Sequence, residues 1–171
     1  MKKKSLIILI LLHSLLLMVV YIFQGMIFPF MRLNGLVPLL LPTAAAGIAL
    51  YEGRDIGGIA GLFAGILCDI SFNQPVGVFT VFLTITGLVV GTLADAVVLR
   101  GFVTYYITCG IVLVVSAFIQ TFPFLIDMEG NTTVFTLIPT AIEQTIYSLV
   151  LAFPIWFFIR ALGNWTDRLK G

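Results

Sequence analysis

Long apolar segments follow one another along the chain, with only short polar breaks between them. Five of these segments hold 18 or more residues, and the only charged or histidine side chains within them are His13 and Glu143. A helix of that length spans most or all of the hydrocarbon core of a bilayer, which is about 30 Å thick. The five segments are 6–23, 33–51, 76–94, 101–126 and 134–159. The pattern therefore predicts helices that cross a membrane.

A sixth helix is predicted over residues 56–71, in a region where glycine recurs at every fourth position. The residues that share this spacing are Gly53, Gly57, Gly61, Gly65 and, at the next step, Asp69. On a helix, such spacing leaves one face without side chains. Another helix can approach that face closely, which favours association in lipid. The glycines are therefore candidates for a helix-packing or partner interface.

The next helix carries a similar pattern. Gly87, Gly91 and Asp95 repeat the spacing of Gly61, Gly65 and Asp69, and a leucine follows the first glycine in both segments. A chance match between leucine-rich helices with small residues is the preferred interpretation, and a true inverted repeat is the alternative. Under either interpretation both helices have a small-residue face, so we expect them to pack on each other.

Three ionisable side chains fall inside the predicted spans. The uncharged stretch 56–68 before Asp69 is only 13 residues long, about 20 Å of helix, so Asp69 lies within the bilayer. Glu143 lies at a similar depth, and the two carboxylates could share a proton or hold a cation. Over this shared site we favour two simpler interpretations. Asp69 caps the amino terminus of a helix, and Glu143 is protonated. For His13, a neutral ring bonded to a backbone carbonyl is favoured over a proton relay.

Composition supports the membrane assignment. Hydrophobic residues make up 60% of the chain and charged residues 10%, which excludes a water-soluble domain. The predicted fold is all-α: a single polytopic transmembrane domain over residues 1–171, with six helices in a compact bundle. Their approximate ranges are 6–24, 36–51, 56–71, 76–95, 102–124 and 135–159.

Basic residues set the predicted orientation. With six alternating helices and a cytoplasmic amino terminus, eight basic residues lie on the cytoplasmic side and only Arg32 lies outside. The eight are Lys2, Lys3, Lys4, Arg54, Arg100, Arg160, Arg168 and Lys170. Positive charge concentrates in cytoplasmic loops of membrane proteins. Both termini are therefore predicted to be cytoplasmic.

Motifs for catalysis are close to absent from the sequence. The chain has one histidine, no spacing typical of metal ligands, no Gly-x-Ser-x-Gly and no nucleotide-binding loop. A net charge of +1 gives no reason to expect nucleic acid. We therefore expect a protein without enzymatic activity, metal or cofactor.

One stretch resembles a known family, the rod shape-determining MreD family of bacterial inner-membrane proteins. The residues that carry the resemblance are Pro38, Gly57, Gly61, Leu62, Gly65, Asp69 and the tripeptide Pro75-Val76-Gly77. Leu39 departs from the pattern, since family members often have an acidic residue beside that proline.

The resemblance implies a non-enzymatic scaffold or adaptor of the cell-wall elongation machinery in the cytoplasmic membrane. Its implied partners are an MreC-like bitopic membrane protein and peptidoglycan synthesis enzymes, with a homo-oligomer also possible. The family is also similar in fold to the substrate-binding subunits of energy-coupling-factor vitamin transporters, which supplies an alternative function. The loop 25–34 is apolar enough to close a vitamin site, but few polar side chains lie near it. The scaffold is therefore preferred.

Overall fold

The computed structural model describes residues 3–27, 38–72, 77–97, 101–126 and 132–170. Within these ranges the chain forms six α-helices and no strand, and a short π-helix, η1 (Phe23–Ile27), continues the first helix. The α-helices are α1 (Lys3–Ile22), α2 (Leu40–Glu52), α3 (Arg54–Phe72), α4 (Val78–Val97), α5 (Phe102–Ile126) and α6 (Thr132–Lys170). The all-α prediction is confirmed.

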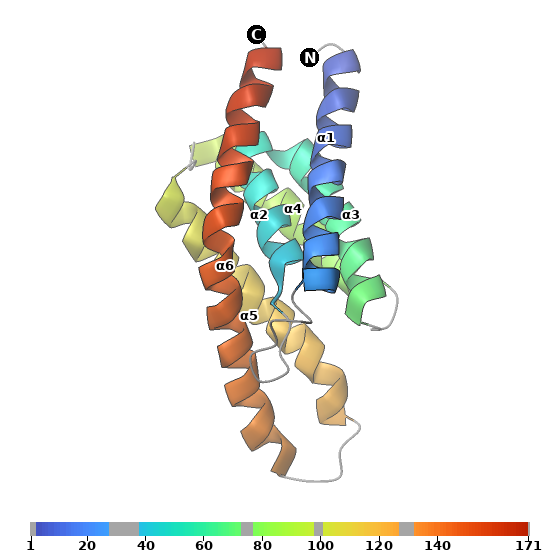
Figure 1. Cartoon of the computed structure of the whole chain (residues 1–171), viewed down its shortest axis with the longest axis vertical. Coiled ribbons are helices and arrows are strands. Elements are labelled where there is room, and N and C mark those ends of the chain that lie inside the picture. Colours follow the sequence, from blue (N-terminus) through green and yellow to red (C-terminus); the bar gives the residue numbers. More distant parts are fainter. Residues whose placement is uncertain (1–2, 28–37, 73–76, 98–100, 127–131, 171) are drawn as a thin grey trace.

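The helices are arranged around α2 (Figure 1). The two ends of the chain lie at the same end of the bundle, and the α5–α6 hairpin extends beyond the other helices at the opposite end. Every residue of α2 from Leu40 to Leu50 is buried. Its sequence is rich in alanine, and a Cβ at Gly47 would lie 2.8 Å from the Tyr105 ring and 2.5 Å from Ile159. Small side chains therefore let α5 and α6 approach the central helix closely.

The outer surface of the bundle is apolar, as a protein in lipid requires. Side chains with exposed fractions above 60% include Leu11, Ile70, Val103 and Phe158. In the described part of the chain, four segments are long and apolar enough to cross a membrane: Ile7–Gly25, Val78–Ala96, Phe102–Gln120 and Ala141–Gly163. The protein is therefore a helical membrane protein with four candidate spans, and the expectation of six spans stays a prediction.

Two predicted helix limits were wrong. The second helix begins at Leu40 rather than at residue 36, so Pro38 precedes it. The last helix continues to Lys170 rather than ending near residue 159, because hydropathy reports the apolar segment and not the helix, which can continue in polar sequence. Several sequence features named above lie outside the described residues: Lys2, Arg32, Pro75, Val76, Arg100 and most of the loop 25–34.

Candidate functional site

The backbones of α3 and α4 touch where their glycines meet. A Cβ atom at Gly57 would lie 2.9 Å from the carbonyl oxygen of Gly87, and a Cβ at Gly87 would overlap the carbonyl oxygen of Gly57. A side chain on either residue would therefore push the two helices apart. The contact is reciprocal, as expected of two antiparallel helices that present the same small-residue face.

The contact continues in both directions along the helices. A Cβ at Gly61 would overlap the carbonyl oxygen of Leu83, and one at Gly65 would lie 2.7 Å from that of Phe79. At the other end, a Cβ at Gly91 would lie 2.7 Å from the backbone nitrogen of Arg54. The glycine groove of α3 is thus filled by the chain's own α4, so a partner protein would have to bind another surface.

Asp69, near the end of α3, caps the amino terminus of α4. Its Oδ2 accepts hydrogen bonds from the backbone N–H groups of Gly77 (2.9 Å) and Thr80 (3.2 Å) and from the Thr80 hydroxyl (2.6 Å), and its Oδ1 accepts one from Phe79 N–H (2.9 Å). The side chain is only 6% exposed. Backbone donors at a helix amino terminus have no partner within the helix, and a carboxylate there also interacts favourably with the helix dipole.

Asp95, near the end of α4, makes the complementary contact with α3. Its Oδ2 accepts a hydrogen bond of 3.0 Å from the backbone N–H of Arg54, the first residue of α3. The carboxylate also packs against Gly53, where a Cβ would overlap Oδ1. Unlike Asp69, Asp95 is exposed. Each helix of the pair therefore caps the other.

Two glycines have backbone conformations that other residues rarely adopt. Gly53, between α2 and α3, has φ of 84°, and Gly77, before α4, has φ of 107°. A positive φ is accessible to glycine because it lacks a Cβ atom. Nothing surrounds the Cβ position of Gly77 within 4 Å, so conformation rather than space requires glycine at this position of the Pro-Val-Gly motif.

The amino terminus of α2 is capped by two other elements. Gln24 of η1 accepts hydrogen bonds from the N–H groups of Leu40 (3.1 Å) and Leu41 (3.2 Å) through its Oε1. Ser148 of α6 accepts one of 2.8 Å from Leu39 N–H through its Oγ. With 13 residues, α2 is about 20 Å long, shorter than the hydrocarbon core. An end of α2 that lies in lipid cannot bond to water, so polar side chains must satisfy it.

His13 faces Glu52, the last residue of α2. The His13 Nδ1 lies 2.8 Å from the Leu9 carbonyl oxygen, and its Nε2 lies 3.6 Å from Glu52 Oε1. Glu52, Gln24 and Ser148 are functional positions that the sequence did not predict. Glu52 lies at a helix boundary, where a charged residue is common and does not indicate a functional site. Nothing in the sequence identifies Gln24 or Ser148 as a helix cap.

Glu143 and Asp69 are in different environments. Glu143 is exposed on α6, whereas Asp69 is buried and its four described hydrogen bonds come from Gly77 and from the first turn of α4. The role of Asp69 as a helix cap therefore explains the contacts described for it. A cation or proton shared between the two carboxylates is not needed to explain the burial of Asp69.

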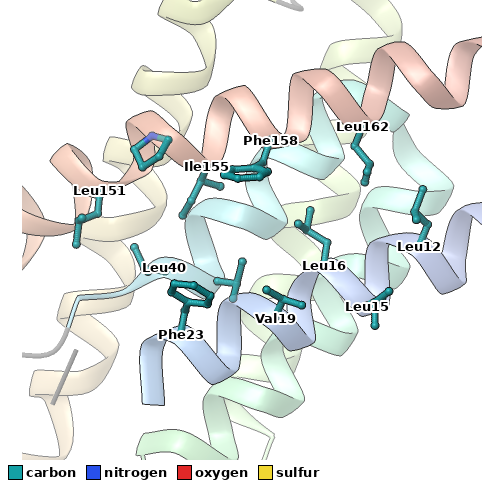
Figure 2. Close-up of a pocket in the computed structure, with 12 residues that line it drawn as sticks. Leu12, Leu15, Leu16, Val19, Phe23, Leu40, Leu151, Ile155, Phe158 and Leu162 are labelled. Carbon is teal, nitrogen blue, oxygen red and sulfur yellow. The ribbon is translucent and has the colours of Figure 1, made fainter. Parts of the chain in front are cut away.

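A groove of about 490 Å³ opens between α1 and α6, with Leu40 of α2 at its base. Figure 2 shows its two walls facing each other. The lining side chains are all apolar: Leu12, Leu15, Leu16, Val19, Val20, Phe23, Leu40, Leu151, Pro154, Ile155, Phe158 and Leu162. Such a lining offers no hydrogen bond to a polar vitamin and suits an apolar occupant.

No cluster of three or more histidine, cysteine or acidic side chains that could hold a metal ion occurs among the described residues. Together the apolar exterior, the small-residue helix contact and the internally capped helix ends define a helical integral membrane protein.

Residues 2–163 match the family model of the rod shape-determining protein MreD. The chain belongs to the MreD family. No curated protein and no solved structure matches it.

Proposed function

We propose that this member of the MreD family is a non-enzymatic scaffold of the cell-wall elongation machinery in the bacterial cytoplasmic membrane. In this role it links an MreC-like bitopic membrane protein to peptidoglycan synthesis enzymes. The observation that carries the proposal is the match of residues 2–163 to the family of rod shape-determining proteins. This match supports a role in cell shape, and the scaffold of wall synthesis is the form of that role that we propose.

The distribution of polar groups supports a scaffold. The polar contacts of Asp69, Gln24 and Ser148 are made within the chain. The surface left for partners is mostly apolar, with exposed large hydrophobic side chains on every helix that the structure describes except α2, although charged residues such as Glu143 and Asp95 are also exposed. A scaffold in lipid recruits other helices through close packing rather than through polar chemistry, so this division between core and surface fits the proposed role.

Co-purification from native membranes tests the proposal. The tagged chain is purified in mild detergent from cells in which it replaces the native copy, and the proteins that accompany it are identified by mass spectrometry. We expect an MreC-like protein and wall-synthesis enzymes, and we expect depletion of the chain to round the cells. Recovery of an ATPase module with a transmembrane coupling subunit, and unchanged cell shape, would instead indicate the vitamin transporter subunit.

A further inference from the structure

The apolar groove between α1 and α6 lies at the depth of the membrane core. Its walls belong to two candidate spans, Ile7–Gly25 and Ala141–Gly163, and Figure 2 shows the walls facing each other. The hydrocarbon core of a bilayer contains no water, so an apolar groove at this depth is filled by a lipid chain or by another protein. The proposed scaffold role does not specify which of the two fills it.

The groove is about as long as one leaflet of the bilayer is thick. One wall runs from Leu12 of α1 to Phe23 at the start of η1, and the other runs from Leu151 to Leu162 of α6. Each wall therefore extends over about 16 Å of helix. Half of the hydrocarbon core measures about 15 Å. The groove thus matches the depth that one acyl chain occupies in one leaflet.

The two walls are too close together for a transmembrane helix to lie between them. The Cα atoms of α1 and α6 approach within 8 Å of each other, which places the two helix axes no more than about 13 Å apart at that point. A helix between them would need about 8–10 Å to each axis, or about 16–20 Å in all. An acyl chain is a single row of methylene groups and is much narrower. It can lie between the walls and contact Leu40, the residue of α2 at the base of the groove.

Contact on three sides distinguishes the groove from the rest of the lipid-facing surface. A lipid chain beside the outer face of α4, where Val81 is 60% exposed, contacts one helix. A chain in the groove contacts α1, α6 and Leu40 of α2 at the same time. Dispersion contacts are individually weak but add up over many atoms. We therefore expect a chain in the groove to be held longer than the chains around it.

Basic residues lie beyond one end of the groove. Leu12 and Leu162 line the end that is nearer to the two ends of the chain, which lie together at one end of the bundle (Figure 1). The first turn of α1 and the last turn of α6 contain one acidic residue, Asp167, and four basic residues: Lys3, Lys4, Arg168 and Lys170. Clustered positive charge next to a membrane attracts the head groups of anionic lipids.

The spacing between groove and charge suits a phospholipid. Along the helices, Lys4 lies about 12 Å beyond Leu12, and Arg168 lies about 9 Å beyond Leu162. The head-group region adds about 5–7 Å to each side of the hydrocarbon core, and lysine and arginine side chains are long enough to make up the difference. We propose that the groove binds an anionic phospholipid, with one acyl chain between α1 and α6 and its head group among the basic residues of the two helix ends.

Photo-crosslinking in nanodiscs tests this site. The full chain is placed in phosphatidylcholine nanodiscs that contain a small fraction of phosphatidylglycerol with a diazirine midway along one acyl chain. After irradiation, mass spectrometry locates the labelled residues. We expect label on both walls, around Leu16 and Ile155, and several-fold less label there from a phosphatidylcholine with the same diazirine chain. Equal labelling by the two lipids, or label spread evenly over the groove and the outer face of α4, would overturn the proposal.

Tryptophan substitutions on opposite walls test the position of the acyl chain. Leu16→Trp and Ile155→Trp each fill part of the groove and should lower the labelling of the facing wall several-fold. Val81→Trp is the matched control, since it adds the same side chain to the exposed face of α4 and should leave labelling of the groove unchanged. Thermal unfolding in detergent identifies variants that fold. Unchanged labelling in both folded groove variants would show that the chain lies elsewhere.

Neutral substitutions test the position of the head group. Replacement of Lys3, Lys4, Arg168 and Lys170 by glutamine should reduce labelling by phosphatidylglycerol to the level of phosphatidylcholine, without a change in the latter. Arg54→Gln is the control, because Arg54 is an exposed basic residue at the start of α3 and does not line the groove. A preference for phosphatidylglycerol that survives the fourfold replacement, or that Arg54→Gln also abolishes, would contradict the proposal.

Crosslinking in cells distinguishes a lipid from a protein in the groove. Val19, a lining residue that is 45% exposed, is replaced by the photoreactive amino acid p-benzoylphenylalanine in the full chain. On irradiation we expect adducts with the mass of a phospholipid. An adduct with a second copy of the chain, or with a single-pass membrane protein, would show that a helix covers the groove and would overturn the proposal. The result does not depend on the scaffold role, which co-purification tests separately.

Discussion

Asp69 and Asp95 each cap the helix that carries the other. Asp69 of α3 accepts the first N–H groups of α4, and Asp95 of α4 accepts the first N–H of α3. Between the caps, glycines on both helices bring the two backbones into contact. The repeated pattern of two glycines followed by an aspartate therefore has one structural meaning in both helices. In the described residues, side chains of α3 and α4 themselves close the antiparallel pair at both ends.

The two caps should differ in their contribution to stability. Asp69 is buried with four hydrogen bonds, and Asp95 is exposed with one described bond. We expect Asp69→Leu to cost about 2–4 kcal/mol, since it leaves several buried donors unsatisfied, and Asp95→Leu to cost about 1 kcal/mol. Thermal unfolding of both variants in the same detergent checks this order. Equal losses would show that burial does not decide the strength of these caps.

Asp69→Asn separates capping from a role for charge. Asparagine is almost as good a cap as aspartate, but its amide nitrogen cannot accept the bond from Phe79 N–H. We expect a loss of about 1 kcal/mol, near-normal abundance in the membrane and retained cell shape. Complementation of a depleted strain, with abundance measured by immunoblot, is the readout. Normal abundance with complete loss of shape would mean that the charge itself has a function.

Leucine at Gly61 or Gly65 should separate α3 from α4. A side chain there meets the backbone of Leu83 or of Phe79 and Thr80, and overpacking of this kind costs about 1–3 kcal/mol. We expect a lower unfolding temperature and loss of cell shape. Leu62→Ala is the matched control, because Leu62 is 44% exposed on the neighbouring face. Normal folding of both glycine variants would contradict the close contact.

Gly77→Ala tests backbone conformation apart from space. The Cβ position of Gly77 is empty, but its φ of 107° is strained for alanine. We expect a loss of about 1–2 kcal/mol, in contrast to Gly110→Ala on α5, which has equally open space and a helical backbone and should gain slightly. Unfolding temperatures of the two variants provide the comparison. An unchanged Gly77→Ala would indicate that the loop relaxes to accept it.

Fused reporters test the predicted orientation. Eight basic residues against one predict that both termini lie in the cytoplasm, and both ends of the chain lie at one end of the bundle (Figure 1). A fluorescent reporter that matures only in the cytoplasm should therefore be active at either terminus, and a periplasmic phosphatase at neither. Activity on opposite sides would require an odd number of spans.

Hydropathy was sufficient to predict five of the six helices, because long apolar segments in lipid must form helices to satisfy their backbones, and the sixth was predicted in the glycine-rich region 56–71. The glycine spacing likewise predicted the small-residue faces of α3 and α4, since a period of four places those residues on one side of a helix. The family resemblance, carried by a few residues of this region, was confirmed by the match over residues 2–163. The helices, their small-residue faces and the family motif all depend on the spacing of residues along the chain, and this spacing can be read directly from the sequence.

The partners of the polar side chains depended on the tertiary structure. The sequence did not say which helix amino terminus Asp69 caps, and the antiparallel packing of α3 and α4 decides that it is that of α4. Gln24 and Ser148 meet at the start of α2 although they lie far apart in the sequence. Glu52 meets His13 because α2 ends beside α1. Such contacts depend on how helices are placed relative to one another, and periodicity within a single helix does not identify which residue of another helix a polar side chain will meet.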